Sequence, residues 1–165
     1  MKHFSDLPAI VLGPLATRPD ADWYQAPAGR WTAAQIVEHL ALGLQWSAAG
    51  FEDRRARDPM VRRPLKLRER AARVFILDLG VFPPFLRAPE RAIPPEKIER
   101  HVAEEHFRNG FERIQEVAKL LLPARSRDLF VKHPRLGDLT LPEWMEFHLR
   151  HARHHAKQIR RRIAG

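Results

Sequence analysis

The chain has 165 residues, of which 44% are hydrophobic and 30% charged, and it contains no cysteine. This length and composition predict one globular domain over residues 1–165. The lack of cysteine excludes a disulfide framework, a cysteine-ligated zinc site and a cysteine nucleophile. No run approaches the roughly 18 uninterrupted apolar residues of a membrane span, and nothing requires an oxidising compartment, so we expect a cytoplasmic protein.

The first half of the chain reads as helices separated by prolines. Residues 4–16 are predicted to form a first helix. A secretory signal is not expected there, because prolines interrupt the apolar run that such a signal needs. A turn-rich stretch follows over residues 18–30. Thr32 and Gln35 have the spacing of a capping box, which predicts that a long helix begins at residue 33 and continues to about residue 56.

The second half continues the helical pattern. We predict a short helix over residues 67–79, a proline-rich connection over 82–95, and a long helix over 96–122 with apolar residues at three- and four-residue steps. An irregular link over 123–138 follows, with at most a short extended piece near Phe130 and Val131.

A second capping box opens the final helix. Thr140 and Glu143 have the same spacing as the first pair, and the helix should reach about Ile163. No segment shows the strict alternation of a sheet strand. The predicted fold is therefore an all-α bundle with an additional short helix and long proline-rich connections, and bundles of this kind place ligand sites between facing helices.

Positive charge is concentrated in two segments. The formal net charge is +9, yet residues 54–73 hold nine basic and two acidic residues, and the chain from residue 150 onward holds six basic residues and no acidic one. Solvated helix faces or an anion-attracting rim around a pocket would explain both segments. Nucleic-acid binding is not expected, because interleaved aromatic side chains for stacking are missing.

Histidines give the clearest chemical signal. There are nine, and four lie in the last predicted helix. Only His151 and His155 have the i,i+4 spacing that places two imidazoles on one helical face, the arrangement by which two histidines hold zinc in H-E-x-x-H helices. His39 lies in an otherwise apolar stretch of the helix 33–56 and is the leading candidate for a third ligand.

Three neutral imidazoles bind zinc, nickel or iron(II) and leave positions open for water or substrate. We therefore predict a divalent transition metal, zinc or nickel before iron, at His39, His151 and His155. The alternative is that the pair belongs to a partly exposed polar face. The remaining histidines fall into two groups: His148 and His154 are expected to flank the site or face solvent, and His3, His101, His106 and His133 to be structural or on the surface.

Two stretches resemble the signatures of the DinB-like superfamily. Trp31 is followed by His39-Leu40 in a predicted helix, residues 133–144 read H-P-x-x-G-x-L-T-x-x-E-W, and residues 151–159 read H-x-x-H-H-x-x-Q-I. The resemblance implies a four-helix bundle in which one histidine of the second helix and two of the last hold a metal. Carried onto this chain, those ligands are again His39, His151 and His155.

The resemblance also implies a homodimer. Some relatives are metal-dependent transferases that join low-molecular-weight thiols to electrophiles, and others are isomerases or hydrolases. A thiol would have to come from a small-molecule cofactor, because the chain has no cysteine. Residues 58–95 match no part of the signatures, and we expect substrate specificity there.

Other residues are candidates for supporting roles, although the sequence assigns no catalytic residue. Gln158, one turn beyond His155, could hydrogen-bond a ligand, as could Glu38 or Glu143. Arg150 or Arg153 could attract an anionic thiol cofactor, but a solvated helix face is the simpler interpretation.

The alternative to an enzyme is a non-enzymatic helical binding module. Such a module would bind an anionic partner through the basic segments 54–73 and 150–162, and its histidines would be structural.

Overall fold

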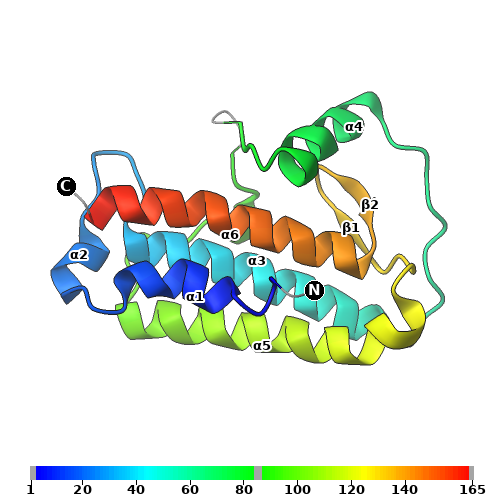
Figure 1. The fold of residues 1–165 in the computed structure, drawn as a ribbon, viewed down its shortest axis with the longest axis horizontal. Coiled ribbons are helices and arrows are strands. Elements are labelled where there is room, and N and C mark those ends of the chain that lie inside the picture. Colours follow the sequence, from blue (N-terminus) through cyan, green and yellow to red (C-terminus); the bar gives the residue numbers. More distant parts are fainter. Residues whose placement is uncertain (1–2, 84–86, 164–165) are drawn as a thin grey trace.

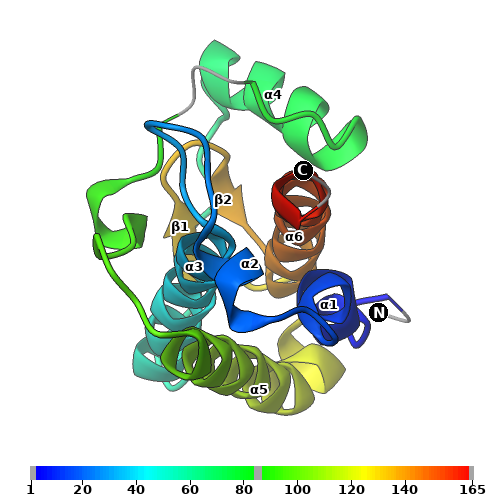
Figure 2. The same cartoon turned by 90° about the vertical axis from the view of Figure 1, so that its left-hand side faces the viewer.

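The computed structural model describes residues 3–83 and 87–163 and is mainly helical, with one small two-stranded sheet. Three long helices, α3 (Ala33–Arg54), α5 (Arg100–Arg125) and α6 (Leu141–Ile163), lie alongside one another (Figure 1). The shorter α1 (Leu7–Leu12) packs against α5 and α6. Figure 2, which looks along the helices, shows α1, α3, α5 and α6 around a common interior.

Both predicted capping boxes are present and fix the starts of the helices that matter for function. At α3, the Thr32 hydroxyl accepts a hydrogen bond from the Gln35 backbone N–H at 3.2 Å, and the Gln35 side-chain oxygen accepts one from the Thr32 N–H at 3.0 Å. At α6, Glu143 accepts from the Thr140 backbone N–H at 2.7 Å. These reciprocal bonds satisfy N–H groups that the first turn leaves free.

The predicted boundaries of α5 are wrong at both ends. The helix begins at Arg100 rather than residue 96, because the Gln35 amide donates to the carbonyls of Pro95 and Glu96 and holds this stretch outside the helix. It also continues through Pro123 to Arg125. Proline removes one backbone donor, and in the last turn the helix tolerates that loss.

Several short helices differ from the sequence interpretation. The first predicted helix is divided into α1 and the 3-10 turn η1 (Gly13–Leu15), and the helix predicted over 67–79 into α4 (Leu67–Arg73) and the π-helical η2 (Val74–Asp78). Two more lie in stretches expected to be turns or connections: α2 (Asp20–Tyr24), anchored by the buried Trp23, and η3 (Glu90–Ala92).

The expectation of no sheet is corrected, although the first strand lies at the short extended piece expected near Phe130 and Val131. Strands β1 (Val131–His133) and β2 (Gly137–Leu139) pair antiparallel, with His133 opposite Gly137. The turn between them is held by the His133 Nδ1 atom, which accepts from the backbone N–H groups of Arg135 and Leu136 at 3.1 and 3.0 Å. Trp144 of α6 donates from its indole to the Val131 carbonyl at 2.9 Å and ties the sheet to the helix.

Most of the buried hydrophobic residues form one continuous cluster that includes side chains from α1, α3, α5, α6 and the sheet. Among the described residues, no helix combines the length and the apolar character needed to cross a membrane.

Candidate metal centre

The three histidines chosen from the sequence lie together between α3 and α6. His39 comes from α3, and His151 and His155 come from consecutive turns of α6. Nε2 of His151 lies 3.3 Å from Nε2 of His39 and 3.0 Å from Nε2 of His155. One ligand atom from each ring lies within 4.8 Å of the other two, so the group could hold a metal ion.

These separations fit nitrogen ligands of one ion. Two nitrogens each about 2.1 Å from an ion are about 3.0 Å apart at a right angle and about 3.4 Å apart at a tetrahedral angle. The two Nε2 pairs that involve His151 fall in or close to this range. Each of these two pairs therefore has a separation that suits two nitrogen ligands of one transition metal ion.

Hydrogen bonds at the opposite ring nitrogens fix the tautomers of two ligands. Nδ1 of His39 lies 2.6 Å from the Ala92 carbonyl oxygen, which can only accept. Nδ1 of His155 lies 2.8 Å from Oε1 of Gln158, while the amide nitrogen of Gln158 lies 3.1 Å from Nε2 of His154 and donates to it. In both ligands the hydrogen is on Nδ1, and Nε2 presents a lone pair.

These tautomers leave two lone pairs pointing at one partner. Nε2 of His39 and Nε2 of His155 both face Nε2 of His151, and a single ring nitrogen can donate only one hydrogen. Three neutral imidazoles in this arrangement cannot satisfy one another. A cation among the three nitrogens would accept all three lone pairs, which is the observation that favours a metal site.

Burial keeps these rings neutral at physiological pH. Loss of solvent lowers the pKa of His39, and lowers the pKa of His155 to about 3. The pKa of His151 is well below its usual value, first because of burial and then because of the neighbouring histidines. Neutral imidazole is the form that binds a metal, so no ligand would have to lose a proton first.

Aromatic side chains surround the cluster. Trp31 lies against His39, with ring centroids 4.9 Å apart. Phe147 stacks on His151 at 5.3 Å, and Phe82 lies 5.2 Å from the same ring. Apolar surroundings restrict water and strengthen electrostatic interactions with a bound ion. Of these contacts, only Trp31 had a signal in the sequence, through the resemblance described above.

His148 flanks the site, one turn before His151 on α6, and the alternative that it faces solvent is wrong. Its side chain is buried, and its Nε2 lies 2.8 Å from the Ser47 hydroxyl of α3. Burial lowers the pKa of His148 to about 3. The ring is therefore a neutral structural group that packs against Trp144, and no sequence pattern indicates Ser47 as its partner.

The other histidines have the structural or surface positions that were expected. His133 is buried and supports the β-turn, and His106 lies beside Glu38 at 3.0 Å. His3 and His101 are exposed, and His154 is half-buried next to the Gln158 amide.

Among the proposed supporting residues, Gln158 is the one that bonds to a ligand histidine. Glu38 is buried but pairs with His106. Glu143 caps α6 and pairs with Arg73 at 3.0 Å. Glu38 and Glu143 were expected to hydrogen-bond a ligand histidine, and their contacts show that they do not. The sequence also missed the Ala92 carbonyl, because a backbone acceptor leaves no residue-specific signal.

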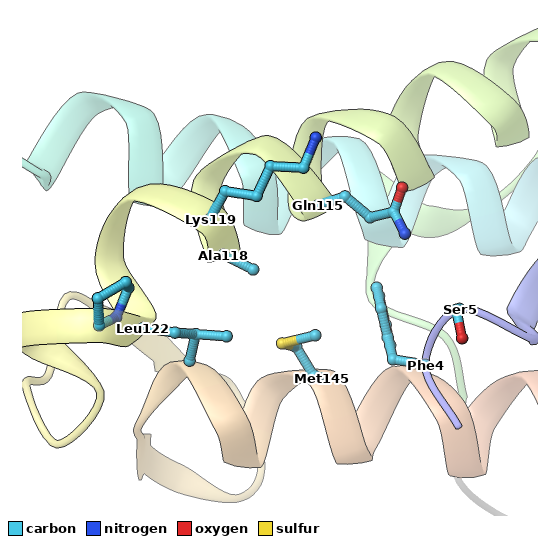
Figure 3. Close-up of a pocket in the computed structure, with 8 residues that line it drawn as sticks. Phe4, Ser5, Gln115, Ala118, Lys119, Leu122 and Met145 are labelled. Atoms are coloured by element: carbon cyan, nitrogen blue, oxygen red, sulfur yellow. The ribbon is translucent and has the colours of Figure 1, made fainter. Parts of the chain in front are cut away.

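A separate apolar pocket of about 260 Å³ lies between the C-terminal half of α5 and the start of α6. Figure 3 shows Ala118 of α5 opposite Met145 of α6, with Leu122 and Phe4 on either side of Met145. None of its lining residues belongs to the histidine cluster or contacts it through the hydrogen bonds and ring contacts described above. This pocket is not part of the candidate metal centre.

Comparison with known proteins shows the family. A family model described as a protein of unknown function, DUF1569, matches residues 17–162. The match covers most of the chain, which therefore belongs to this family. Neither a search of curated proteins nor a search of solved structures found a match.

Proposed function

We propose that this member of the DUF1569 family binds one divalent transition metal ion through Nε2 of His39, His151 and His155 and uses it to activate a small-molecule nucleophile. The observation that supports the proposal is the convergence of two unprotonated nitrogens on a third within 3.3 Å. Imidazole ligands favour zinc or nickel, with iron(II) as a further candidate.

Three protein ligands leave coordination positions for water or substrate, as in catalytic rather than structural sites. When bound, the ion would supply Lewis acidity that lowers the pKa of a coordinating water or thiol. The Ala92 carbonyl and Gln158 hold the rings of His39 and His155 in the required tautomer. Phe82 and Phe147 pack against the His151 ring and restrict water beside it.

We propose thiol transfer as the reaction, with hydrolysis as its closest alternative. The thiol loses its proton to solvent, its sulfur forms a bond to an electrophilic carbon, and the leaving group departs with the bonding electron pair. The sulfur must belong to a low-molecular-weight cofactor, because the chain has no cysteine. In hydrolysis, water would take the place of the thiol.

The lack of cysteine makes a direct test possible. Protein loaded with cobalt(II) is mixed with a small thiol, such as glutathione or cysteine, and the near-ultraviolet spectrum is recorded. A thiolate-to-cobalt charge-transfer band can arise only from the added thiol, since no protein sulfhydryl exists. We expect this band in the wild type and its loss in His151→Ala.

The same samples separate the two reactions. Consumption of thiol and electrophile in equal amounts, dependent on metal and on His151, supports transfer. Metal-dependent hydrolysis of activated esters, without a thiolate-to-cobalt band, would show that the reaction is hydrolysis rather than thiol transfer. Metal binding without either reaction over a range of electrophiles and esters would contradict an enzymatic role.

We also propose that the fold is a four-helix bundle of the DinB-like type in which the short α1 takes the place of one long helix. The position of α1 against α5 and α6 supports this assignment. The same likeness leads us to propose a homodimer, which sedimentation velocity would detect as a species of twice the 19.2 kDa chain mass.

The alternative of a non-enzymatic basic module receives less support. Within residues 54–73, four of the nine basic side chains form ion pairs inside the molecule. They are Arg57, Arg62, Arg63 and Arg73. Arg73 also donates to the carbonyls of Leu136 and Asp138, so part of this segment stabilises the fold rather than offering free charge to a partner.

A further inference from the structure

A polar pocket of about 360 Å³ lies on the other side of α6 from α3, between α6, α1 and the chain just after η2. Four cationic side chains of α6 line it at positions that share one helical face: Arg150, Arg153, Lys157 and Arg160. Ile10 of α1 and Leu79 supply apolar wall. A volume of this size is sufficient for a small organic molecule.

The positive charge of this pocket is poorly compensated. Arg150 pairs with Glu146 one turn earlier. Within residues 3–83 and 87–163, no ion pair is formed by Arg153, Lys157 or Arg160. Basic side chains that converge on a hollow without acidic partners produce a positive potential that attracts anions.

The backbone opposite the helix is shaped to approach these cations. Gly80 has φ +65°, a conformation that side chains disfavour, and a Cβ there would lie 3.3 Å from the Arg150 guanidinium. Glycine therefore allows the chain to close one wall of the pocket against Arg150.

The pocket is also next to the candidate metal centre. His154 lines the pocket and accepts a hydrogen bond from Gln158, whose oxygen bonds the ligand His155. The Phe82 ring lies 4.9 Å from His154 and 5.2 Å from the ligand His151, so one side chain lies close to both sites.

We propose that this pocket binds the anionic group, a phosphate or carboxylate, of the small organic molecule on which the protein acts. The guanidinium groups would hold the anion, since their planar forks match the oxygens of either group. Ile10 and Leu79 would contact the apolar part of the ligand. The assignment of this pocket as the site that holds the substrate's anionic group rests on the proposed metal function. The proposal that the pocket binds anions does not depend on that function.

The test is calorimetric titration with phenyl phosphate, an anion with an apolar body. The protein is the full chain treated with a chelator, so that binding is measured without metal, and the titration is repeated on zinc-loaded protein. We expect saturable binding of one equivalent, and weaker binding of inorganic phosphate, which lacks the apolar part. Neutral benzyl alcohol should not bind.

Two charge variants locate the site. Arg153→Gln/Lys157→Gln should weaken phenyl phosphate binding at least tenfold. The matched control Lys97→Gln/Arg127→Gln removes the same charge from exposed positions outside the pocket and should change binding less than twofold. Circular dichroism establishes that both variants keep their helices.

Absence of saturable binding, or equal weakening by both variants, would overturn the proposal. So would a duplex oligonucleotide that binds more tightly than phenyl phosphate at the same salt concentration, which would indicate a nucleic-acid surface. If metal-free protein binds phenyl phosphate but the histidines hold no metal, the pocket stands and the proposed catalytic function falls. If the histidines hold metal but the protein does not bind phenyl phosphate, the proposed catalytic function stands and the pocket proposal falls.

Discussion

Oε1 of Gln158 lies 2.8 Å from Nδ1 of His155, and both residues lie on α6. This bond places the ring hydrogen on Nδ1 and directs the Nε2 lone pair toward the other two histidines. The amide nitrogen of Gln158 is occupied by His154, which fixes the orientation of the amide. A residue one turn beyond the ligand therefore determines the state of that ligand.

Replacing Gln158 should weaken metal binding without unfolding the protein. We expect Gln158→Leu to lower zinc affinity by about tenfold to 100-fold, because the His155 ring loses the acceptor that orients it. Gln158→Glu keeps an acceptor oxygen at the same distance along the side chain and should retain wild-type affinity or exceed it. Competition with a chelating dye measures both. Equal affinities for Gln158→Leu and the wild type would show that this bond does not orient the ligand.

The buried pair of Ser47 and His148 should contribute to stability rather than to metal binding. The Ser47 hydroxyl lies within hydrogen-bond distance of backbone carbonyls of its own helix and 2.8 Å from Nε2 of His148, so Ser47→Ala leaves this buried ring nitrogen without its partner. We expect a loss of about 1–3 kcal/mol in the free energy of unfolding. Urea denaturation measures it, with Ser126→Ala as a control, since Ser126 is only partly buried and lies at the C-terminal end of α5. A loss of zinc stoichiometry in Ser47→Ala would contradict a purely structural role.

Stability should fall as the pH is lowered from 7 to 5. Burial lowers the pKa of His133 and of His148 to about 3, whereas the same groups in the unfolded chain titrate near pH 6.5. Between these values the unfolded state binds more protons, so the contribution of each ring to stability is complete above pH 6.5 and is lost as the pH falls toward 3. Protonation linked to each ring should lower the free energy of unfolding at pH 5 by about 2 kcal/mol relative to neutral pH.

Urea unfolding of metal-free protein at several pH values checks this dependence. His148→Gln should show a shallower decrease between pH 7 and pH 5, and His101→Gln, at an exposed position, should follow the wild type. An unfolding midpoint that is the same at both pH values would contradict the presence of neutral, buried histidines.

The parts of the fold that the sequence predicted are those controlled by local chemistry. Thr32 and Thr140 cap the two helices that bear the ligands, and capping depends on residues three positions apart, which can be read directly. The sheet and η3 depend instead on distant contacts, such as the bond between Trp144 and the Val131 carbonyl. No local pattern contains that information.

The candidate site divides in the same way. His151 and His155 could be paired by helical spacing alone, and His39 joined them through its apolar surroundings and the family resemblance. The bonds that define their tautomers were only partly accessible: Gln158 is one turn away and was identified, whereas Ala92 comes from a turn 53 residues beyond His39 and acts through its backbone. The hydrogen bond that buries His148 could not be predicted, because its partner Ser47 lies 101 residues away in the sequence.

The metal content of the untagged protein tests the central claim most directly. Wild-type protein, His39→Ala, His151→Ala and the exposed control His101→Ala are each saturated with zinc or nickel, freed of excess ion and analysed by mass spectrometry of the metal. We predict close to one ion per chain in the wild type and in His101→Ala, and less than a tenth of that in the other two variants, with helical content retained. No bound transition metal in folded wild-type protein, or equal binding in all four proteins, would contradict the account.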